Sequence, residues 1–165
     1  MKQKGFTLIE LIIVVAIIAL LAAATFVAVN PAKRIGDAQN AQRWADVTAI
    51  ADAFATYMAD NNGSTATSSY DGSGSLETNT FMIATTTSDT AISSSHCTAT
   101  TTDEEFIALQ ALTTGGYIGK IPTDPTWTYS DHNRHTQYYL YYSSAGTITV
   151  GACETYNSAV IKVVR

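Results

Sequence analysis

Residues 4–29 read KGFTLIELIIVVAIIALLAAATFVAV, and this stretch decides how the chain is organised. Every residue from Leu11 to Ala24 is apolar, and Thr25 is the only polar residue between there and Val29. At ~1.5 Å of rise per residue, a helix over residues 6–29 is about 36 Å long, enough to cross a bilayer. The stretch has no polar face of the kind that a core helix of a soluble domain shows. We therefore predict a membrane-spanning helix.

Charged residues around the apolar stretch predict its orientation. Lys2 and Lys4 precede it, and no basic residue follows before Lys33, so the N-terminus stays in the cytoplasm and the rest lies outside. A secretory signal peptide has the same charge bias, and residues 22–24 are small enough for a cleavage site. Glu10 argues against that alternative. A carboxylate in an apolar helix costs about 2.5 kcal/mol or more near the bilayer centre, so it either needs a partner or reaches the headgroups.

The composition of the whole chain excludes several function classes. Its 165 residues fit one domain, with room for a small appendage. The formal net charge of -5 argues against a general nucleic-acid binder, which needs a basic surface for phosphates. No nucleophile–base pattern, glycine-rich phosphate loop or strong metal-ligand cluster is present in the sequence, so we do not expect an enzyme.

The segment from Lys4 to Glu10, followed at once by the apolar run, resembles the class III leader of type IV pilins and type II secretion pseudopilins. The resemblance implies that a prepilin peptidase cuts between Gly5 and Phe6, methylates the new amine of Phe6 and leaves the helix in the mature chain. It also implies that Glu10 pairs with the Phe6 amine of a neighbouring subunit. Because an unpaired buried carboxylate is penalised, such pairing would reject subunits that insert out of register.

A second, amphipathic helix is predicted over residues 31–60. Asn30 is a good N-cap and Pro31 is tolerated at the first helical position, although Pro31 could instead kink or break one continuous helix. Asn61-Asn62-Gly63 supplies a stop. Apolar residues at helical spacing form one face that we expect under a globular head, namely Val47, Ile50, Ala51, Phe54, Tyr57 and Met58.

Residues 61–102 differ sharply in composition, because half of them are Ser or Thr. Such a stretch buries little, and we predict a long surface loop with a short strand near residues 80–85. A capping-box pattern at Thr102–Glu105 predicts a short helix over residues 103–113 that ends at Gly115-Gly116.

The C-terminal part predicts a small sheet. Residues 137–143, 147–150 and 158–164 are rich in aromatic and β-branched residues, which favours three antiparallel strands. Residues 116–125, GYIGKIPTDP, resemble the segment before the sheet in major pseudopilins, with Thr126 as a departure before the aromatic Trp127. The fold class we predict is α+β, with a leader at 1–5, a long N-terminal helix at 6–60 (membrane half 6–29, amphipathic half 30–60) packed on an antiparallel sheet at 137–164, and a head at 61–165.

The two cysteines, Cys97 and Cys153, lie in the part predicted to be outside the membrane. An even count in an exported domain favours one disulfide, and two free buried thiols are the alternative. The disulfide would tie the Ser/Thr-rich loop to the sheet.

We expect no cofactor and no metal site. The resemblance to pseudopilins implies a loop near the sheet that can hold calcium, for which Asp124 and Asp131 are the carboxylate candidates, but these are too few at recognisable spacing. The three histidines, His96, His132 and His135, lack a second pair at ligand spacing, so we interpret them as solvated loop residues.

These observations predict a structural subunit of a type IV pilus filament that polymerises through its N-terminal helix. The alternatives are a pseudopilin in a periplasmic secretion piston and a singly anchored surface binding domain. The Ser/Thr-rich loop and the disulfide favour the pilin, whereas the Pro-x-Asp-Pro segment favours the pseudopilin. Expected partners are further copies of the chain, prepilin peptidase, an assembly platform and, before assembly, the inner membrane. Direct nucleic-acid binding is not expected.

Overall fold

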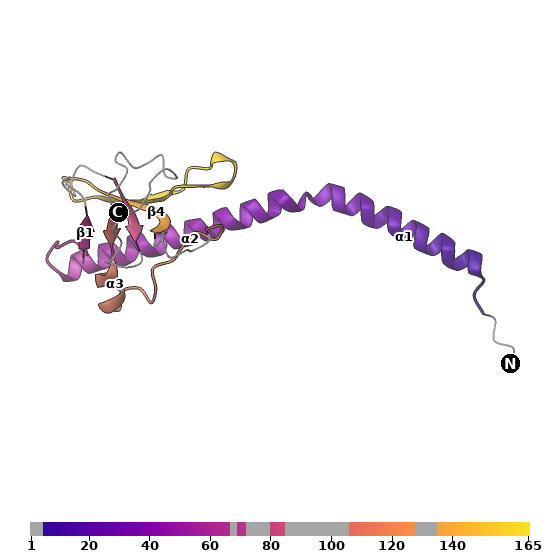
Figure 1. Cartoon of the computed structure of the whole chain (residues 1–165), viewed down its shortest axis with the longest axis horizontal. Coiled ribbons are helices and arrows are strands. Elements are labelled where there is room, and N and C mark those ends of the chain that lie inside the picture. The colour runs from indigo at the N-terminus through magenta and orange to yellow at the C-terminus, as the bar shows by residue number, and fades with distance from the viewer. Residues whose placement is uncertain (1–4, 67–68, 72–79, 85–105, 128–134) are drawn as a thin grey trace. The chain divides into compact units, whose positions relative to one another are not determined.

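The structure is a computed structural model, and it describes residues 5–66, 69–71, 80–84, 106–127 and 135–165. The chain divides into two compact units, Met1–Asp37 and Ala38–Arg165, and each is described by itself. The first unit holds helix α1 (Leu8–Val29) and the first residues of helix α2 (Pro31–Asp60) (Figure 1). The remainder of α2 belongs to the second unit together with the sheet.

Asn30 separates α1 from α2. Its backbone is left-handed, with φ 45° and ψ 77°, a conformation that ends a helix. Its side-chain Oδ1 accepts a hydrogen bond from the backbone N–H of Lys33 at 3.3 Å, as an N-cap does. Pro31 is therefore the first residue of a new helix, where its missing N–H costs nothing. The structure thus has two helices separated at Asn30, and not one continuous helix that is kinked at Pro31.

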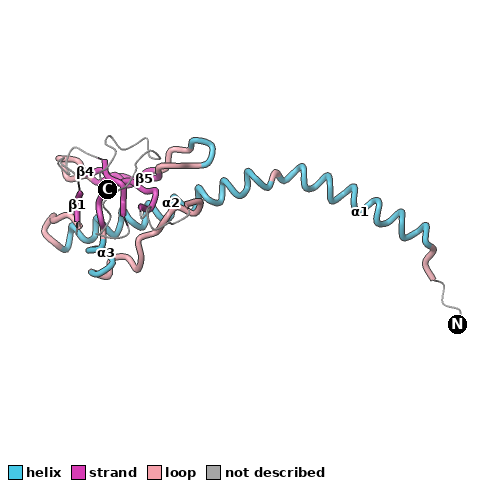
Figure 2. The backbone as a smooth tube through the Cα atoms, viewed as in Figure 1, coloured by secondary structure: helices cyan, strands magenta, loops and turns pink. Residues whose placement is uncertain are grey.

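The strands of the second unit, magenta in Figure 2, lie beside α2. They form one six-stranded sheet in the order β1-β3-β2-β4-β5-β6. Neighbouring strands are antiparallel except β2 and β3, which are parallel. The strands are β1 (Ser69–Asp71), β2 (Thr80–Ala84), β3 (Phe106–Ala108), β4 (His135–Tyr142), β5 (Ile148–Ala152) and β6 (Lys162–Val164).

The core lies between α2 and one face of the sheet. Val47, Ile50 and Phe54 of α2 are fully buried, as the helical spacing of apolar residues predicts. They belong to one hydrophobic cluster with residues of β2, β4 and β5, including Phe81, Leu140 and Val150. The α+β fold class, with an N-terminal helix packed on a mostly antiparallel sheet, is confirmed.

One prediction about the middle of the chain is wrong. The predicted helix over 103–113 is a strand at Phe106–Ala108, and the helical part is only α3 (Gln110–Thr114), which ends at Gly115. The predicted capping box at Thr102–Glu105 lies outside the described residues. At residues 106–108, strand pairing and burial override the local pattern. The short strand predicted near residues 80–85 is confirmed as β2, and its residues Phe81–Ala84 are buried although the stretch 61–102 was expected to bury little.

The sheet is also larger than the three strands predicted. The three C-terminal strands are present as β4, β5 and β6, but the last begins at Lys162, because Tyr156–Ser158 form a 3₁₀ turn in which Asn157 and Ser158 have positive φ.

Candidate processing and assembly site

The predicted cleavage bond, between Gly5 and Phe6, lies just before α1. Residues 5–7 are not helical and are exposed, and the Phe6 side chain is 91% accessible. Thr7, the N-cap, has extended backbone with φ -82° and ψ 152°. The bond is therefore outside the helix and open to an enzyme.

Glu10 lies one turn into α1 and forms a capping box with Thr7. The backbone N–H and the hydroxyl of Thr7 each donate to Glu10 Oε2 at 3.1 Å, and the Glu10 backbone N–H donates to Thr7 Oγ1 at 3.3 Å. The capping box supplies hydrogen-bond acceptors for backbone N–H groups that have no partner within the first turn of the helix. It also places a carboxylate at the positive end of the helix dipole. Glu10 was predicted as a functional residue and Thr7 was not, although the Thr-x-x-Glu spacing in the sequence marks a capping box.

The rest of α1 is an apolar surface without a partner inside the described chain. Leu8–Ala28 is exposed throughout, and by length and composition it can cross a membrane. Large side chains such as Leu20 and Val27 are mostly exposed. An apolar surface of this size in water would be unfavourable, so it requires lipid or other apolar helices around it.

A comparison with protein families decides what this N-terminus is. A family model described as the prokaryotic N-terminal methylation motif matches residues 1–26, which include Gly5, Phe6, Thr7 and Glu10. This match supports a type IV pilin-like or pseudopilin precursor. No curated protein and no solved structure matches it. The pilin-like leader implies processing by prepilin peptidase. Together with the apolar helix, it is consistent with membrane anchoring before assembly. Proteins with this leader form a structural family and not an enzyme family.

A buried ion pair connects α2 of this pilin-like chain to the segment between α3 and β4. Arg43 Nε donates to Asp124 Oδ2 at 2.6 Å and Nη2 donates to Asp124 Oδ1 at 3.0 Å, while both side chains are almost completely buried. Thr126 donates to Asp124 Oδ1 through its backbone N–H at 2.8 Å and through its hydroxyl at 2.6 Å. The Pro-x-Asp-Pro segment is thus held by an aspartate turn and a two-pronged contact with α2.

Two further contacts extend this connection along α2. The Asn40 side chain accepts from the Tyr156 backbone N–H at 2.9 Å and donates to the Tyr156 carbonyl at 3.0 Å. Arg43 Nη1 donates to the same Asn40 Oδ1 at 3.0 Å, which joins this contact to the ion pair. The Tyr138 hydroxyl donates to Asp46 Oδ2 at 2.8 Å. Arg43 and Asn40 lie in a polar stretch of the sequence, and no local pattern reveals partners more than 80 residues away.

The remaining predicted site residues are not brought together. Asp124, a calcium candidate, uses both carboxylate oxygens on Arg43 and Thr126, and the other candidate, Asp131, lies outside the described residues. In the part of the chain that the structure describes, no group of three or more His, Cys, Asp or Glu side chains could hold a metal ion. Cys153 follows β5, but Cys97 lies outside the described residues, so the disulfide stays a prediction.

His135 corrects a further interpretation, that of the histidines as solvated loop residues. It is the first residue of β4 and is only 2% exposed. Its ring lies 4.7 Å from that of Trp127, between ring centres. His96 and His132 lie outside the described residues.

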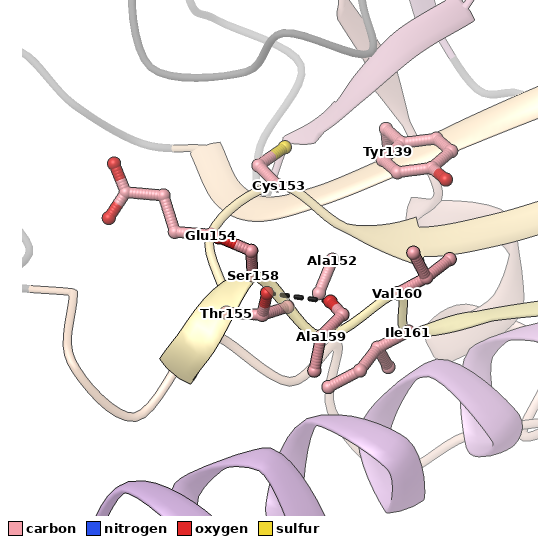
Figure 3. A pocket seen from close by; sticks show the side chains of 9 residues that line it. All are labelled: Tyr139, Ala152, Cys153, Glu154, Thr155, Ser158, Ala159, Val160 and Ile161. Carbon is pink, nitrogen blue, oxygen red and sulfur yellow. Dashed lines mark hydrogen bonds between the residues drawn. The ribbon is translucent and has the colours of Figure 1, made fainter.

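A groove of about 480 Å³ lies between Tyr139 of β4 and the loop that follows β5 (Figure 3). Of its polar groups, the Thr155 hydroxyl already donates to the Ala159 carbonyl at 2.6 Å, and the Glu154 side chain points away from Tyr139. A ligand site usually has several polar groups that converge. The groove therefore lacks the convergent polar groups that are typical of a ligand site.

Proposed function

We propose that this pilin-like chain is a structural subunit of a type IV pilus filament. The observation that carries the proposal is the unburied apolar α1, which has a carboxylate, Glu10, fixed at its N-terminal end. Before assembly this helix would lie in the cytoplasmic membrane with the head outside. After cleavage at Gly5, the helices of many subunits would pack together and their heads would coat an extracellular filament.

A role for Glu10 favours polymerisation over a simple membrane anchor. A singly anchored surface domain gains nothing from a carboxylate near the start of its membrane helix, and charged groups in such helices are usually functional. Cleavage after Gly5 would create a cationic amine on Phe6. Pairing between this amine and Glu10 of a neighbouring subunit would neutralise both groups in the dry filament core and set the register of the helices.

The second candidate is a pseudopilin that forms a short periplasmic filament for protein secretion. The specific observation in its favour is the segment GYIGKIPTDP, which resembles that of major pseudopilins and whose Asp124 is buried against Arg43. The Ser/Thr-rich stretch at 61–102 favours an exposed pilus surface instead, so we keep the pilus as the proposal.

Electron microscopy combined with mass analysis tests the proposal. Surface filaments sheared from cells should be labelled by antibodies against the head, and their subunit should have the mass of a chain that starts at methylated Phe6. A mature chain that starts near Thr25 would identify a secretory signal peptide and overturn the proposal. Filaments that appear only in the periplasm, and only with the secretion machinery present, would identify the pseudopilin.

A further inference from the structure

We propose that the edge strand β6 of one head pairs with the edge strand β1 of a neighbouring copy, so that the sheets of successive heads join into one. The inference rests on the proposed filament and adds a contact between heads to the packing of the helices. β6 and β1 stand at the two ends of the strand order, and each has one neighbour among the described strands.

The outer edge of β6 has backbone groups that are available for pairing. Directly after β6, Arg165 exchanges both backbone hydrogen bonds with Ile148, each at 2.9 Å. Along an antiparallel ladder such residues alternate with residues whose N–H and C=O groups face the other way, which in β6 are Lys162 and Val164. Their backbone groups therefore point away from β5. An edge of this kind is a template for a further strand.

The side chains along this edge are apolar except for one lysine. Val160 is 75% exposed and Val164 is 54% exposed, and Lys162 between them is exposed as well. The alternate residues, Ile161 and Val163, are buried. Natural edge strands avoid unwanted pairing by short length, by proline, by bulges or by charges such as lysine. Lys162 is therefore the residue that decides whether this edge repels or recruits a second strand.

Charge favours a second copy of the chain as the occupant of the edge. The head, residues 61–165, has nine acidic and four basic side chains, so attraction between two heads requires a basic part of one against an acidic part of the next. In the part of the chain that the structure describes, no ion pair includes Lys162. β1 ends at Asp71. Antiparallel pairing of β6 with β1 puts these two residues opposite each other, where unlike charges stabilise a strand pair.

Pairing between unlike edges also suits a filament. Two β6 strands that paired with each other would make the same contact from both sides and would close at a dimer. A contact between β6 and β1 is heterologous, so each copy keeps one free edge for the next copy. The contact can therefore repeat along a polymer.

Photocrosslinking within sheared filaments tests the contact. The photoreactive residue p-benzoylphenylalanine in place of Val164 should crosslink to a second copy at residues 69–71, whereas the same residue in place of the exposed Lys120 should not reach them. We expect Lys162→Glu to lower the crosslink yield from the Val164 position on the order of fivefold, as the loss of an exposed ion pair would. Adding Asp71→Lys to Lys162→Glu should restore the yield. The matched control, Lys120→Glu, should leave it unchanged.

Two results would overturn the inference in filaments that form normally. One is the absence of crosslinks from the Val164 position to residues 69–71 of another copy, including the case in which a different protein is crosslinked instead. The other is a crosslink yield that Lys162→Glu leaves unchanged, because glutamate keeps edges apart as well as lysine does and Lys162 would then have that role alone. Both results leave the proposed function intact. The absence of filaments from the wild-type chain would instead refute the filament on which the inference rests.

Discussion

At the scale of single residues, the least expected finding is the buried ion pair between Arg43 and Asp124. Arg43 lies in a polar stretch of α2 and Asp124 was a candidate calcium ligand, yet their side chains are only 3% and 1% exposed. Removing two charges from water is costly, and the cost is recovered only with good geometry and further hydrogen bonds. Thr126 and Asn40 provide these additional bonds.

We predict that Arg43→Met or Asp124→Ala lowers the free energy of unfolding by about 3–5 kcal/mol, because each leaves a buried charge without its partner. The double variant Arg43→Met/Asp124→Leu should be more stable than either single variant. The control is Arg165→Met, whose exposed pair with Asp52 should contribute less than about 1 kcal/mol. Denaturant unfolding of the detergent-solubilised chain measures all four. Equal losses at Arg43 and Arg165 would argue against a structural role for the buried pair.

The same pair predicts how stability depends on pH. Burial raises the pKa of Asp124, but hydrogen bonds from Arg43 and Thr126 outweigh it and hold the pKa below the ordinary 3.8. Because the folded pKa is depressed, this stabilisation is complete above the unfolded pKa and is lost as the pH falls through the folded value. The pKa of Asp46 is raised, mainly by burial, so its protonation offsets part of the loss.

Unfolding curves between neutral and strongly acidic pH should therefore show the wild-type chain losing stability below about pH 4. In Asp124→Asn the loss should be smaller, since that variant has no carboxylate to protonate at the buried pair. An unchanged acid dependence in the variant would mean that other groups cause it.

At the scale of elements, the sequence predicts the helices and strands that have a local pattern of apolar, aromatic or β-branched residues. The spacing of Val47, Ile50 and Phe54 identifies the buried face of α2, and the aromatic and β-branched runs identify β4 and β5. The strand β3 was not predictable in this way. Its residues, Phe106–Ala108, follow an acidic helix-start pattern, and only pairing with β1 and β2 makes a strand the better state. Likewise, the partner of Arg43 depends on tertiary contacts that no spacing reveals.

The pairing of β4 with β5 brings Tyr139 opposite Gly151. A Cβ atom added to Gly151 would collide with the outer atoms of the Tyr139 ring. We therefore predict that Gly151→Ala destabilises the head by about 1–3 kcal/mol, as overpacking does. In a Tyr139→Ala background the same change should cost much less. If the cost is the same in both backgrounds, the tyrosine ring does not determine the need for glycine.

The predicted Cys97–Cys153 disulfide would attach the Ser/Thr-rich stretch to the end of β5. Closing such a long loop typically stabilises a domain by about 2–4 kcal/mol. We expect the mass of the unfolded chain to stay unchanged on alkylation without reductant and to rise by two adducts after reduction. Two adducts before reduction would show free thiols.

At the scale of the whole molecule, an exposed apolar helix and a folded head have different requirements. The helix needs lipid or other helices, whereas the head has its own core. Loss of residues 1–5 removes Lys2 and Lys4, two positive charges, and changes the formal side-chain charge from -5 to -7. The head itself, residues 61–165, has nine Asp or Glu and four Lys or Arg side chains. Heads on a filament would repel one another mildly, and helix packing has to outweigh that repulsion.

Polymerisation through Glu10 is the central claim, and the Glu10→Val variant tests it most directly. The measurement is the amount of subunit in the sheared filament fraction relative to membrane-bound subunit, for wild type and variant. Losing one member of a buried ion pair costs about 3–5 kcal/mol at each interface, so we predict that filaments disappear or become much shorter, while cleavage after Gly5 and folding of the head persist. Wild-type amounts of filament from a correctly processed Glu10→Val chain would contradict the account.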